Sequence, residues 1–427
     1  MLIIEALPEV AGPPPGSLRR PATGRGSLAA AGGCRRLVLL GGLLALGWVP
    51  AEVRAQQLLN FAYADSLTQA LLAQHRYRAL DSVGRAARAL GVAYPALGCR
   101  LGAGALASGR LAAALRYYEA ALRENPLDPD ARAGLALTYQ AFNQPGAATL
   151  LAGALPDSLR RALYLPGPRA LAAVEAEASV LTTGQRGRGP ASYGRLGASS
   201  RLGSRFLLSQ EISYYNQEVE LPRPAMPGTP SIIEQHLISQ EQYHALLTAQ
   251  LGARWQAKAG YDFISRDLGS NHLGYLALAY ARPRWVAQAG AYAGVLADTA
   301  RTQADLRLTV YPLGNLRFYT FGRGSVVASG GRGYGNGLLG AGGRLRPWLW
   351  AEAWAGGGTV PVLAELDGTY VYNLLDPLRR RAAASLLILA PRRLALRLTY
   401  GTEQRRITLP DISYVLHSFT STLTWTW

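Results

Sequence analysis

The sequence predicts a protein of two structured parts, a short α-solenoid followed by an antiparallel transmembrane β-barrel of about 14 strands, within a range of about 12 to 16. Three observations predict this order. Residues 61–161 place Ala and Leu at three- and four-residue spacing, residues 173–427 alternate apolar and polar positions, and the chain ends on Trp-Thr-Trp. Such periods are those of helices and strands. We therefore expect helical repeats in residues 56–165 and the barrel in residues 166–427.

The composition favours a membrane protein over a nucleic-acid-binding one. Only 17% of the residues are charged, compared with about a quarter in a soluble domain. The formal net charge is +17 and Lys258 is the only lysine, so arginine carries the positive charge. An excess of positive charge can indicate binding to nucleic acid, to an anionic membrane or to an acidic polymer. It can also simply reflect the codon usage of a GC-rich genome. No segment resembles a base-reading module, so we expect no nucleic-acid partner.

Residues 1–55 have the features of an extended amino-terminal region followed by a secretory signal peptide. A pair of arginines precedes an apolar run of about 13 residues, and residues 53–55 form a small-x-small cleavage site. The run is shorter than the roughly 20 apolar residues of a membrane-spanning helix. We therefore expect an exported chain that begins near Gln56. Because Cys34 precedes the apolar run, we expect no amino-terminal lipid anchor.

The helical part contains a repeat with a period of about 34 residues. The copy at 95–128 has small residues for close helix packing, a tyrosine between them and a proline that ends the second helix. The pattern resembles the tetratricopeptide repeat (TPR), although Ala105 stands where an aromatic residue is usual. The resemblance implies a solenoid whose concave face holds a peptide or partner protein; an ordinary helical bundle is the alternative. The predicted packing residues are Leu101, Gly102, Ala114, Tyr118, Ala121, Pro126 and Tyr139.

Beyond Pro166 the sequence consists of short alternating runs separated by Gly, Pro, Asn and Asp. The run at 254–263, for example, places Trp255 on the opposite face from Lys258 and Asp262. About 14 such runs can be marked, and their lengths of about 10–15 residues suit strands that cross a bilayer at a tilt.

The links between the runs alternate between short and long. Links of three or four residues alternate with longer segments such as 220–234, 329–336 and 361–378. Short turns on the periplasmic side and long loops on the extracellular side are typical of outer-membrane barrels. We therefore expect the long segments, including the glycine-rich stretch at 329–336, to be extracellular loops. A soluble β-sandwich is the alternative, but it would not show this alternation.

The carboxy-terminal segment has one apolar and one hydroxylated face. Large apolar residues alternate with threonines, so this segment is predicted to be the strand that closes the barrel. The apolar positions resemble the insertion signal of outer-membrane proteins, which implies recognition by the barrel-assembly machinery. These positions are Phe419, Leu423, Trp425 and Trp427.

The sequence contains no recognisable catalytic or metal-binding motif. The five histidines form no HExxH or His-x-His pattern and no paired cysteines accompany them. A GxSxG nucleophile motif is also absent. We therefore expect no catalytic residue, no metal, no cofactor and no enzyme activity. The alternative is a loop-side metal site built from His236, His244 and His272, which lie on nearby predicted hairpins.

The inward-facing positions of the predicted strands carry charges of both signs with an excess of basic residues. On a lumen wall they would favour an anionic solute or a polyhydroxylated one such as a glycan; alternatively they brace the barrel. The candidate lumen-lining residues are Arg254, Lys258, Asp262, Asp305, Arg307, Arg344, Glu352 and Arg397.

The order of signal peptide, TPR repeats and carboxy-terminal barrel resembles the YaiO family of outer-membrane proteins. The resemblance covers the mature chain, but only the repeats and the last strand carry residue-specific motifs. It implies a Gram-negative outer membrane as the location, with the TPR region in the periplasm. The partners implied are outer-membrane lipid, the barrel-assembly machinery and a periplasmic protein on the TPR face.

Three functions are compatible with the sequence. In the first, a porin-like or polysaccharide-export barrel passes a solute or glycan while a periplasmic partner docks on the repeats. In the second, a non-conducting barrel anchors the repeats at the membrane. In the third, a barrel enzyme acts on lipid or surface glycan, which would need a Ser–His or similar arrangement that sequence alone does not locate.

Overall fold

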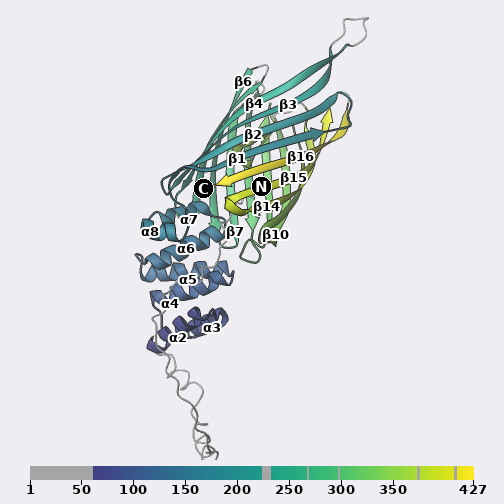
Figure 1. The fold of residues 1–427 in the computed structure, drawn as a ribbon. Helices are drawn as coiled ribbons and strands as arrows, with labels where there is room; N and C mark the ends of the chain where they lie inside the picture. The colour runs from purple at the N-terminus through teal and green to yellow at the C-terminus, as the bar shows by residue number, and fades with distance from the viewer. Residues whose placement is uncertain (1–60, 224–231, 267–268, 297–298, 373–375, 408–410) are drawn as a thin grey trace, which may run out of the picture.

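The computed structural model describes residues 61–427, apart from 224–231, 267–268, 297–298, 373–375 and 408–410. The predicted signal peptide lies outside the described residues. Figure 1 shows a stack of helices at one end of a β-barrel. The described chain thus contains a helical part and a barrel in the predicted order.

Seven helices form the amino-terminal part of the described chain. The first helices of three successive pairs begin at Phe61, Pro95 and Pro129, which are 34 residues apart, as the predicted period requires. The helices are α2 (Phe61–Ala73), α3 (Tyr77–Ala89), α4 (Pro95–Ala107), α5 (Leu111–Glu124), α6 (Pro129–Ala141), α7 (Pro145–Ala152) and α8 (Asp157–Ala162).

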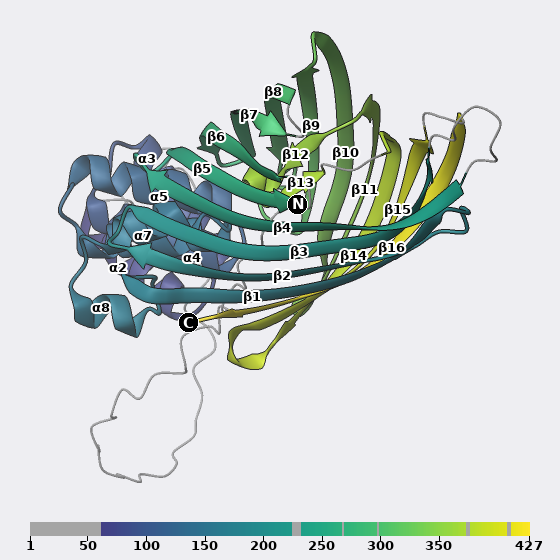
Figure 2. The same ribbon diagram turned by 90° about the horizontal axis from the view of Figure 1, so that it is seen from above.

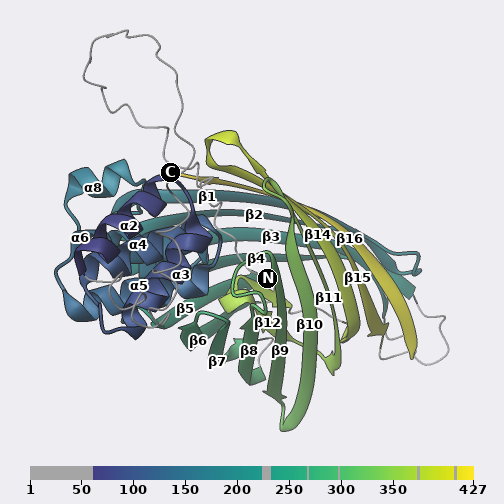
Figure 3. The ribbon, with the colours of Figure 1, turned by 90° about the horizontal axis from the view of Figure 1, so that it is seen from below.

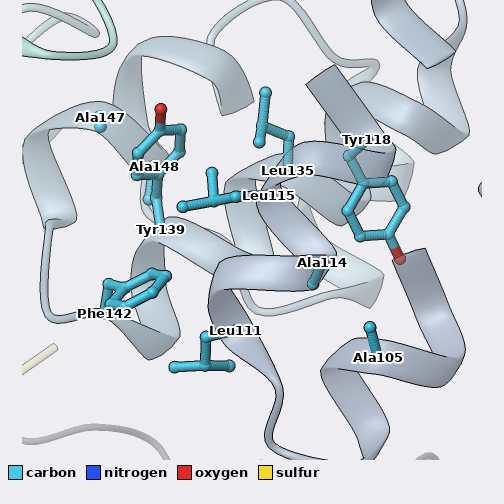
Figure 4. Packing of buried hydrophobic residues seen from close by; sticks show 10 residues of the cluster. All are labelled: Ala105, Leu111, Ala114, Leu115, Tyr118, Leu135, Tyr139, Phe142, Ala147 and Ala148. Carbon is cyan, nitrogen blue, oxygen red and sulfur yellow. The ribbon is translucent and has the colours of Figure 1, made fainter. Parts of the chain in front are cut away.

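The ring of Tyr118 is the centre of packing between the second and third helix pairs (Figure 4). It lies against Gly102 of α4 and Gly134 of α6, where an added Cβ atom would stand 2.7 and 2.2 Å from the ring. Glycine at these positions allows three helices to approach one aromatic ring. The other predicted packing residues that are buried in the stack are Leu101, Ala114, Ala121 and Tyr139.

Fourteen antiparallel strands of the described chain close into a barrel, which confirms the predicted fold class (Figures 1 and 2). Each strand pairs with its neighbours in sequence order, and β1 pairs with β16 to complete the cylinder. The barrel strands are β1 (Arg169–Thr182), β2 (Arg188–Leu202), β3 (Phe206–Arg223), β4 (Ile232–Gln250), β5 (Trp255–Arg266), β6 (Gly269–Arg282), β7 (Trp285–Leu296), β8 (Thr299–Val310), β9 (Phe318–Ser329), β10 (Arg332–Arg346), β11 (Leu349–Val360), β14 (Leu378–Ala390), β15 (Leu394–Ile407) and β16 (Ile412–Thr426).

Apolar side chains cover the outer face of the barrel, and polar side chains point inward. Leu306, Val326 and Leu339 are 63%, 63% and 74% exposed, whereas Asp262 is fully buried. Because successive residues of a strand point to opposite faces, this contrast follows directly from the alternation in the sequence. An apolar outer band with aromatic residues such as Trp255 at its edge is the lipid-facing surface of a membrane barrel.

The short links between strands all lie at one end of the barrel, which we call the short-turn end. These links are β2–β3, β4–β5, β6–β7, β8–β9, β10–β11 and β14–β15. The opposite end is the long-loop end. One predicted loop there is shorter than expected: of residues 329–336, only Gly330 and Gly331 form the turn, with φ angles of 57° and 73°. The reason is that β10 pairs with β9 from Arg332 onward.

The described residues 361–372, which follow β11, lie inside the barrel (Figures 2 and 3). Residues 361–378 were predicted to form an extracellular loop, and for residues 361–372 this placement is wrong. They contain β12 (Leu363–Glu365), the single-turn helix η1 (Leu366–Gly368) and β13 (Tyr370–Tyr372), and β12 pairs with β13 as a hairpin. We call residues 362–372 the lumen plug.

The helical stack is fixed against the short-turn end at the β4–β5 turn (Figures 1 and 3). Arg254 donates a hydrogen bond to Glu119 of α5 at 2.8 Å. Ala253 packs against the helical core, and Gly146 at the start of α7 lies so close to Gln250 that a Cβ atom would stand 2.3 Å from its Oε1. Gly153 after α7 also lies against Ser204 of the β2–β3 turn, and Ala112 of α5 lies against Gly314 of the β8–β9 turn, so three short turns contact the helical stack.

We expect Gly134→Ala to destabilise the helical stack, because the new methyl group overlaps the Tyr118 ring at a cost of about 1–3 kcal/mol. Alanine offsets roughly 1 kcal/mol of this cost through its higher helix propensity, so the net destabilisation should be up to about 2 kcal/mol. Thermal unfolding followed by circular dichroism at 222 nm measures the change. The control is Arg116→Ala at an exposed position of α5. An unchanged or higher midpoint for Gly134→Ala would contradict this account of the packing.

Replacement of Trp425 and Trp427 by alanine should reduce barrel assembly, because both rings lie at the end of the strand that closes the cylinder. The rings stack at a centroid distance of 5.2 Å, and aromatic residues at this level anchor a barrel at the lipid interface. The amount of heat-modifiable barrel in outer-membrane fractions measures assembly. Ser421→Ala, on the same face of β16, is the control, and normal levels of the double variant would rule out the role of the tail.

Candidate functional site

The lumen plug enters the barrel through a tight turn with unusual backbone geometry. Leu366, Asp367 and Gly368 have φ angles of 50°, 64° and 105° in succession. Gly368 has no room for a side chain, since a Cβ atom would stand 2.7 Å from Cε1 of His244 and 2.9 Å from an oxygen of Asp262. The turn therefore holds the plug's backbone directly against the wall formed by β4 and β5.

Glu365 at the end of β12 is bound by two arginines from the barrel wall. Arg323 of β9 and Arg381 of β14 both donate hydrogen bonds to its carboxylate. Arg323 also pairs with Asp305 at 2.8 Å. Burial alone would raise the pKa of Glu365, but Arg381 and Arg323 outweigh burial and hold that pKa at about 2. The carboxylate is therefore ionised throughout the neutral and mildly acidic range.

Asp367 at the tip of the plug makes a second set of polar contacts with a different part of the wall. Lys258 of β5 contacts its Oδ2 at 2.5 Å. The Tyr275 hydroxyl of β6 and the Gln288 side chain of β7 donate to its Oδ1 at 2.6 and 2.7 Å. Despite burial, the Lys258 ammonium and the nearby Arg307 lower the pKa of Asp367 well below its ordinary value. Glu365 and Asp367 thus secure the plug to five strands.

Further hydrogen bonds connect the backbone and Tyr370 of the plug to the wall. Gln303 donates to the carbonyl of Ala364 at 2.7 Å and accepts from its N–H at 3.0 Å. Gln242 donates to the carbonyl of Gly368 at 3.0 Å. The Tyr370 hydroxyl donates to Glu177 at 2.5 Å. The plug's edges are therefore satisfied by side chains, as buried backbone groups require.

One side of the plug is also packed by apolar contacts. Val362, Ala364 and Val371 lie in a buried cluster with Ile264 and Leu273 of the wall. The plug thus combines an apolar face toward β5–β7 with carboxylates directed at arginine and lysine. It is an ordered part of the fold of the described chain.

A chain of charged and hydroxylated side chains continues along the wall beneath the plug. Arg195 of β2 is bound by Glu175, Glu177 and Glu211 from the neighbouring strands. Thr422 of β16 donates to Glu177 at 3.0 Å. The threonine face of the carboxy-terminal strand therefore supports buried carboxylates, while its apolar face contacts lipid.

A cavity of about 180 Å³ lies between the plug and the barrel wall, where residues of β1, β7–β11 and β14–β16 line it. Its lining includes arginines, threonines and aromatic rings, among them Arg307, Arg397, Thr399, Thr420 and Trp354. Glu365 and Asp367 of the plug form its opposite side. The lumen is thus narrowed to a small space with a mixed polar and apolar lining.

The structure brings together most of the predicted lumen residues. Lys258 and Asp305 belong to the ion pairs around the plug, and Arg307 and Arg397 line the cavity. Asp262 contacts Nδ1 of His244 at 2.8 Å. These five inward positions lie on three different strands, β5, β8 and β15, and all of them lie near the plug.

The remaining predicted lumen residues lie elsewhere. Glu352 accepts a hydrogen bond from Tyr319 at 2.7 Å within the wall. Arg254 pairs with the helical stack, and Arg344 is exposed near the short-turn end. The histidines are not gathered either: His244 is buried inside, whereas His272 contacts Tyr261 on the outer face. Among the described residues no group of three His, Cys, Asp or Glu side chains is arranged for a metal ion.

Four important residues of the site were not predicted from the sequence. Glu365 and Asp367 stand in a segment without strand alternation, which gave no indication that it folds inward. Arg323 and Arg381 do stand on predicted strands, and their position on the inward-facing side of the alternation was the signal that could have identified them as lumen residues. Their pairing with Glu365 depends on the path of the plug.

A closed cylinder that is apolar outside, polar inside and filled by one of its own connecting segments is a β-barrel of the outer-membrane type. In the part of the chain that the structure describes, no helix is long and apolar enough to span a membrane. The described features therefore define a membrane barrel joined to a helical-repeat module.

Comparison with known proteins agrees with these two parts. Residues 105–165 match the tetratricopeptide repeat family, which confirms the predicted repeat in that region. No curated protein matches the chain. A solved structure similar in fold is the Pseudomonas putida toluene transporter TodX, with a TM-score of 0.41 and 10% identity over 65% of this chain and 91% of that chain.

Two further barrels are similar to a comparable extent. A bacterial polysaccharide outer membrane secretin has a TM-score of 0.38 and 11% identity, covering 61% of this chain and 99% of that chain. The outer membrane channel DcaP of Acinetobacter baumannii has a TM-score of 0.31 and 9% identity, covering 60% of this chain and 96% of that chain. These similarities concern the fold alone.

The folded pKa of Glu365 predicts how the plug responds to acid. Because this pKa is about 2 and the ordinary value is 4.5, the ion pairs stabilise the closed plug fully above about pH 4.5. That stabilisation should be lost as the pH falls from 4.5 toward 2. Titration of ¹³C-labelled glutamate by NMR measures the midpoint, with the resonance assigned by its absence in Glu365→Gln. A midpoint at or above 4.5 would contradict the paired geometry.

Proposed function

We propose that this protein is a gated outer-membrane conduit in which the lumen plug is the gate. The observation that supports this most directly is the way the plug is held. A segment tethered at both ends fills the lumen, and its two carboxylates are bound to Arg323, Arg381 and Lys258 of the wall.

Such contacts suit a movable element better than a permanent filling. A buried ion pair contributes little net stability relative to its separated and hydrated partners, because desolvation offsets the attraction. Water that enters an open lumen can solvate the carboxylates of Glu365 and Asp367 and their cationic partners. The closed and open positions of the plug can therefore lie within a few kcal/mol, which is the range that a ligand or partner can shift.

The cavity beside the plug supports a polar solute. Arg307 and Arg397 supply positive charge, Glu177, Asp305 and Glu403 supply negative charge, threonine hydroxyls supply hydrogen-bonding groups and Trp354 supplies a ring face. Charges of both signs together with hydroxyl groups and a ring suit a polyhydroxylated solute such as a glycan unit. The notion of glycan passage also agrees with the polysaccharide-export hypothesis raised by the sequence.

The helical repeats are proposed to hold a protein partner near the mouth of the conduit. They pack against the short-turn end through Arg254 and Glu119, and short turns of outer-membrane barrels face the periplasm. This orientation would place the TPR module in the periplasm, as in the YaiO-like organisation that the sequence resembles. A periplasmic protein bound there could deliver the solute or control the gate.

A non-conducting anchor is the second candidate. The observation that favours it is the apolar side of the plug, where Val362 and Val371 pack in a buried cluster. In this case the plug would close the lumen permanently, and the barrel would serve to hold the repeats at the membrane.

Conductance of the refolded protein in a planar bilayer separates the two candidates. The parent protein should show rare openings, and the double variant Glu365→Gln, Asp367→Asn should open far more often. Loss of one partner from buried ion pairs costs about 3–5 kcal/mol, so the open fraction should rise by roughly a hundredfold to several thousandfold. The control is Asp411→Asn, which removes an exposed carboxylate paired with Arg406 outside the lumen. Silence from a double variant that remains a folded, heat-modifiable barrel would favour the anchor.

A further inference from the structure

The short-turn end carries a repeated pairing of arginine and aromatic residues, of which the proposed function uses only Arg254. In four of the six short turns an arginine directly precedes the aromatic residue that begins the next strand. In a fifth turn one proline separates Arg346 from Trp348, the residue before β11. The pairs are Arg205–Phe206, Arg254–Trp255, Arg284–Trp285, Arg317–Phe318 and Arg346–Trp348.

These turns are also free of negative charge. Together they contain ten arginines and no aspartate or glutamate. The long-loop end differs, because acidic residues such as Glu218, Glu220 and Asp411 stand among its arginines. The basic character is therefore a property of one rim of the barrel. The turns counted are 201–206, 250–255, 281–285, 311–318, 344–348 and 390–394.

The aromatic residues that begin the strands face outward, where lipid surrounds the barrel. Trp255 and Trp285 are 46% and 37% exposed, and Trp348, in the turn before β11, is 54% exposed. Arg284 and Arg346, which precede two of them, are exposed as well. Since tryptophan prefers the boundary between hydrocarbon and headgroups, an arginine placed toward the turn reaches the level of the lipid headgroups.

A cluster on β5–β7 shows how the rim is built. Arg282 lies over the ring of Tyr280, with its guanidinium carbon 5.2 Å from the ring centroid. The same ring packs between Trp255 and Trp285 at centroid distances of 4.5 and 5.6 Å. Three aromatic side chains therefore fix one guanidinium at the edge of the apolar band.

We propose that this arginine-rich rim binds the phosphate groups of anionic phospholipids in the leaflet that borders the short turns. Guanidinium groups bind phosphate with paired hydrogen bonds, and the adjacent aromatic ring contacts the upper part of the acyl chains. The pairs recur every second strand, roughly 10 Å apart, around the barrel. This spacing suits a ring of separate lipids better than the compact footprint of one acidic protein.

The test uses quenching of tryptophan fluorescence by brominated lipids, with the folded protein reconstituted in vesicles. At low salt, dibrominated phosphatidylglycerol should quench the parent protein more strongly than dibrominated phosphatidylcholine. The double variant Arg284→Gln, Arg346→Gln removes the arginines beside Trp285 and Trp348. Its preference for phosphatidylglycerol should fall by about fivefold for each arginine lost, and high salt should weaken the preference of the parent.

The matched control is Arg332→Gln with Arg380→Gln, which removes two exposed arginines from the long-loop end. It should retain the parent's preference, and heat-modifiable mobility confirms that both variants are folded. Equal quenching of the parent by the two lipids, or an unchanged preference in the Arg284–Arg346 variant, would overturn the proposal. Relief of quenching by inorganic phosphate, at an ionic strength matched with chloride, would also overturn it by indicating a site for free phosphate. The result does not depend on whether the lumen conducts.

Discussion

Closure of the sheet between β1 and β16 is the constraint on which the rest of this structure depends. In hydrocarbon no water is available for unpaired backbone groups, so a sheet can span a membrane only when its first and last strands pair. The register from Ala173–Thr426 to Thr182–His417 satisfies this requirement. Closure also divides every strand into a lipid face and an enclosed face. The polar residues of the sequence are thereby gathered into one interior.

The positive charges enclosed by the barrel explain why the plug carries two carboxylates. Once Arg323, Arg381 and Lys258 face the interior, each needs a negative partner, because an unpaired charge in a space with little water is costly. Glu365 and Asp367 supply those partners from a single hairpin. The arrangement closes the lumen with contacts that water can replace. In the proposed function, the barrel can therefore keep its fold both with the plug in place and with the plug displaced.

The sequence predicted the wall of the site but not its centre. Lys258, Asp305 and Arg397 were recognised as inward-facing because alternation in a strand fixes the side to which a residue points. Glu365 and Asp367 belong to a segment without such a period. Their partners stand up to 109 residues away in the sequence, so no local pattern could have identified the contacts.

The sequence by itself determined the repeat period of the helices, the alternation of the strands and the order of short and long links, because each depends on residues close together in the chain. It also determined that the chain ends in a closing strand. Only the tertiary structure decided where residues 361–372 lie. A connecting segment joins its strands equally well on either side of the barrel mouth, and its inward path depends on charge pairs with Lys258, Arg323 and Arg381, which stand on three separate strands.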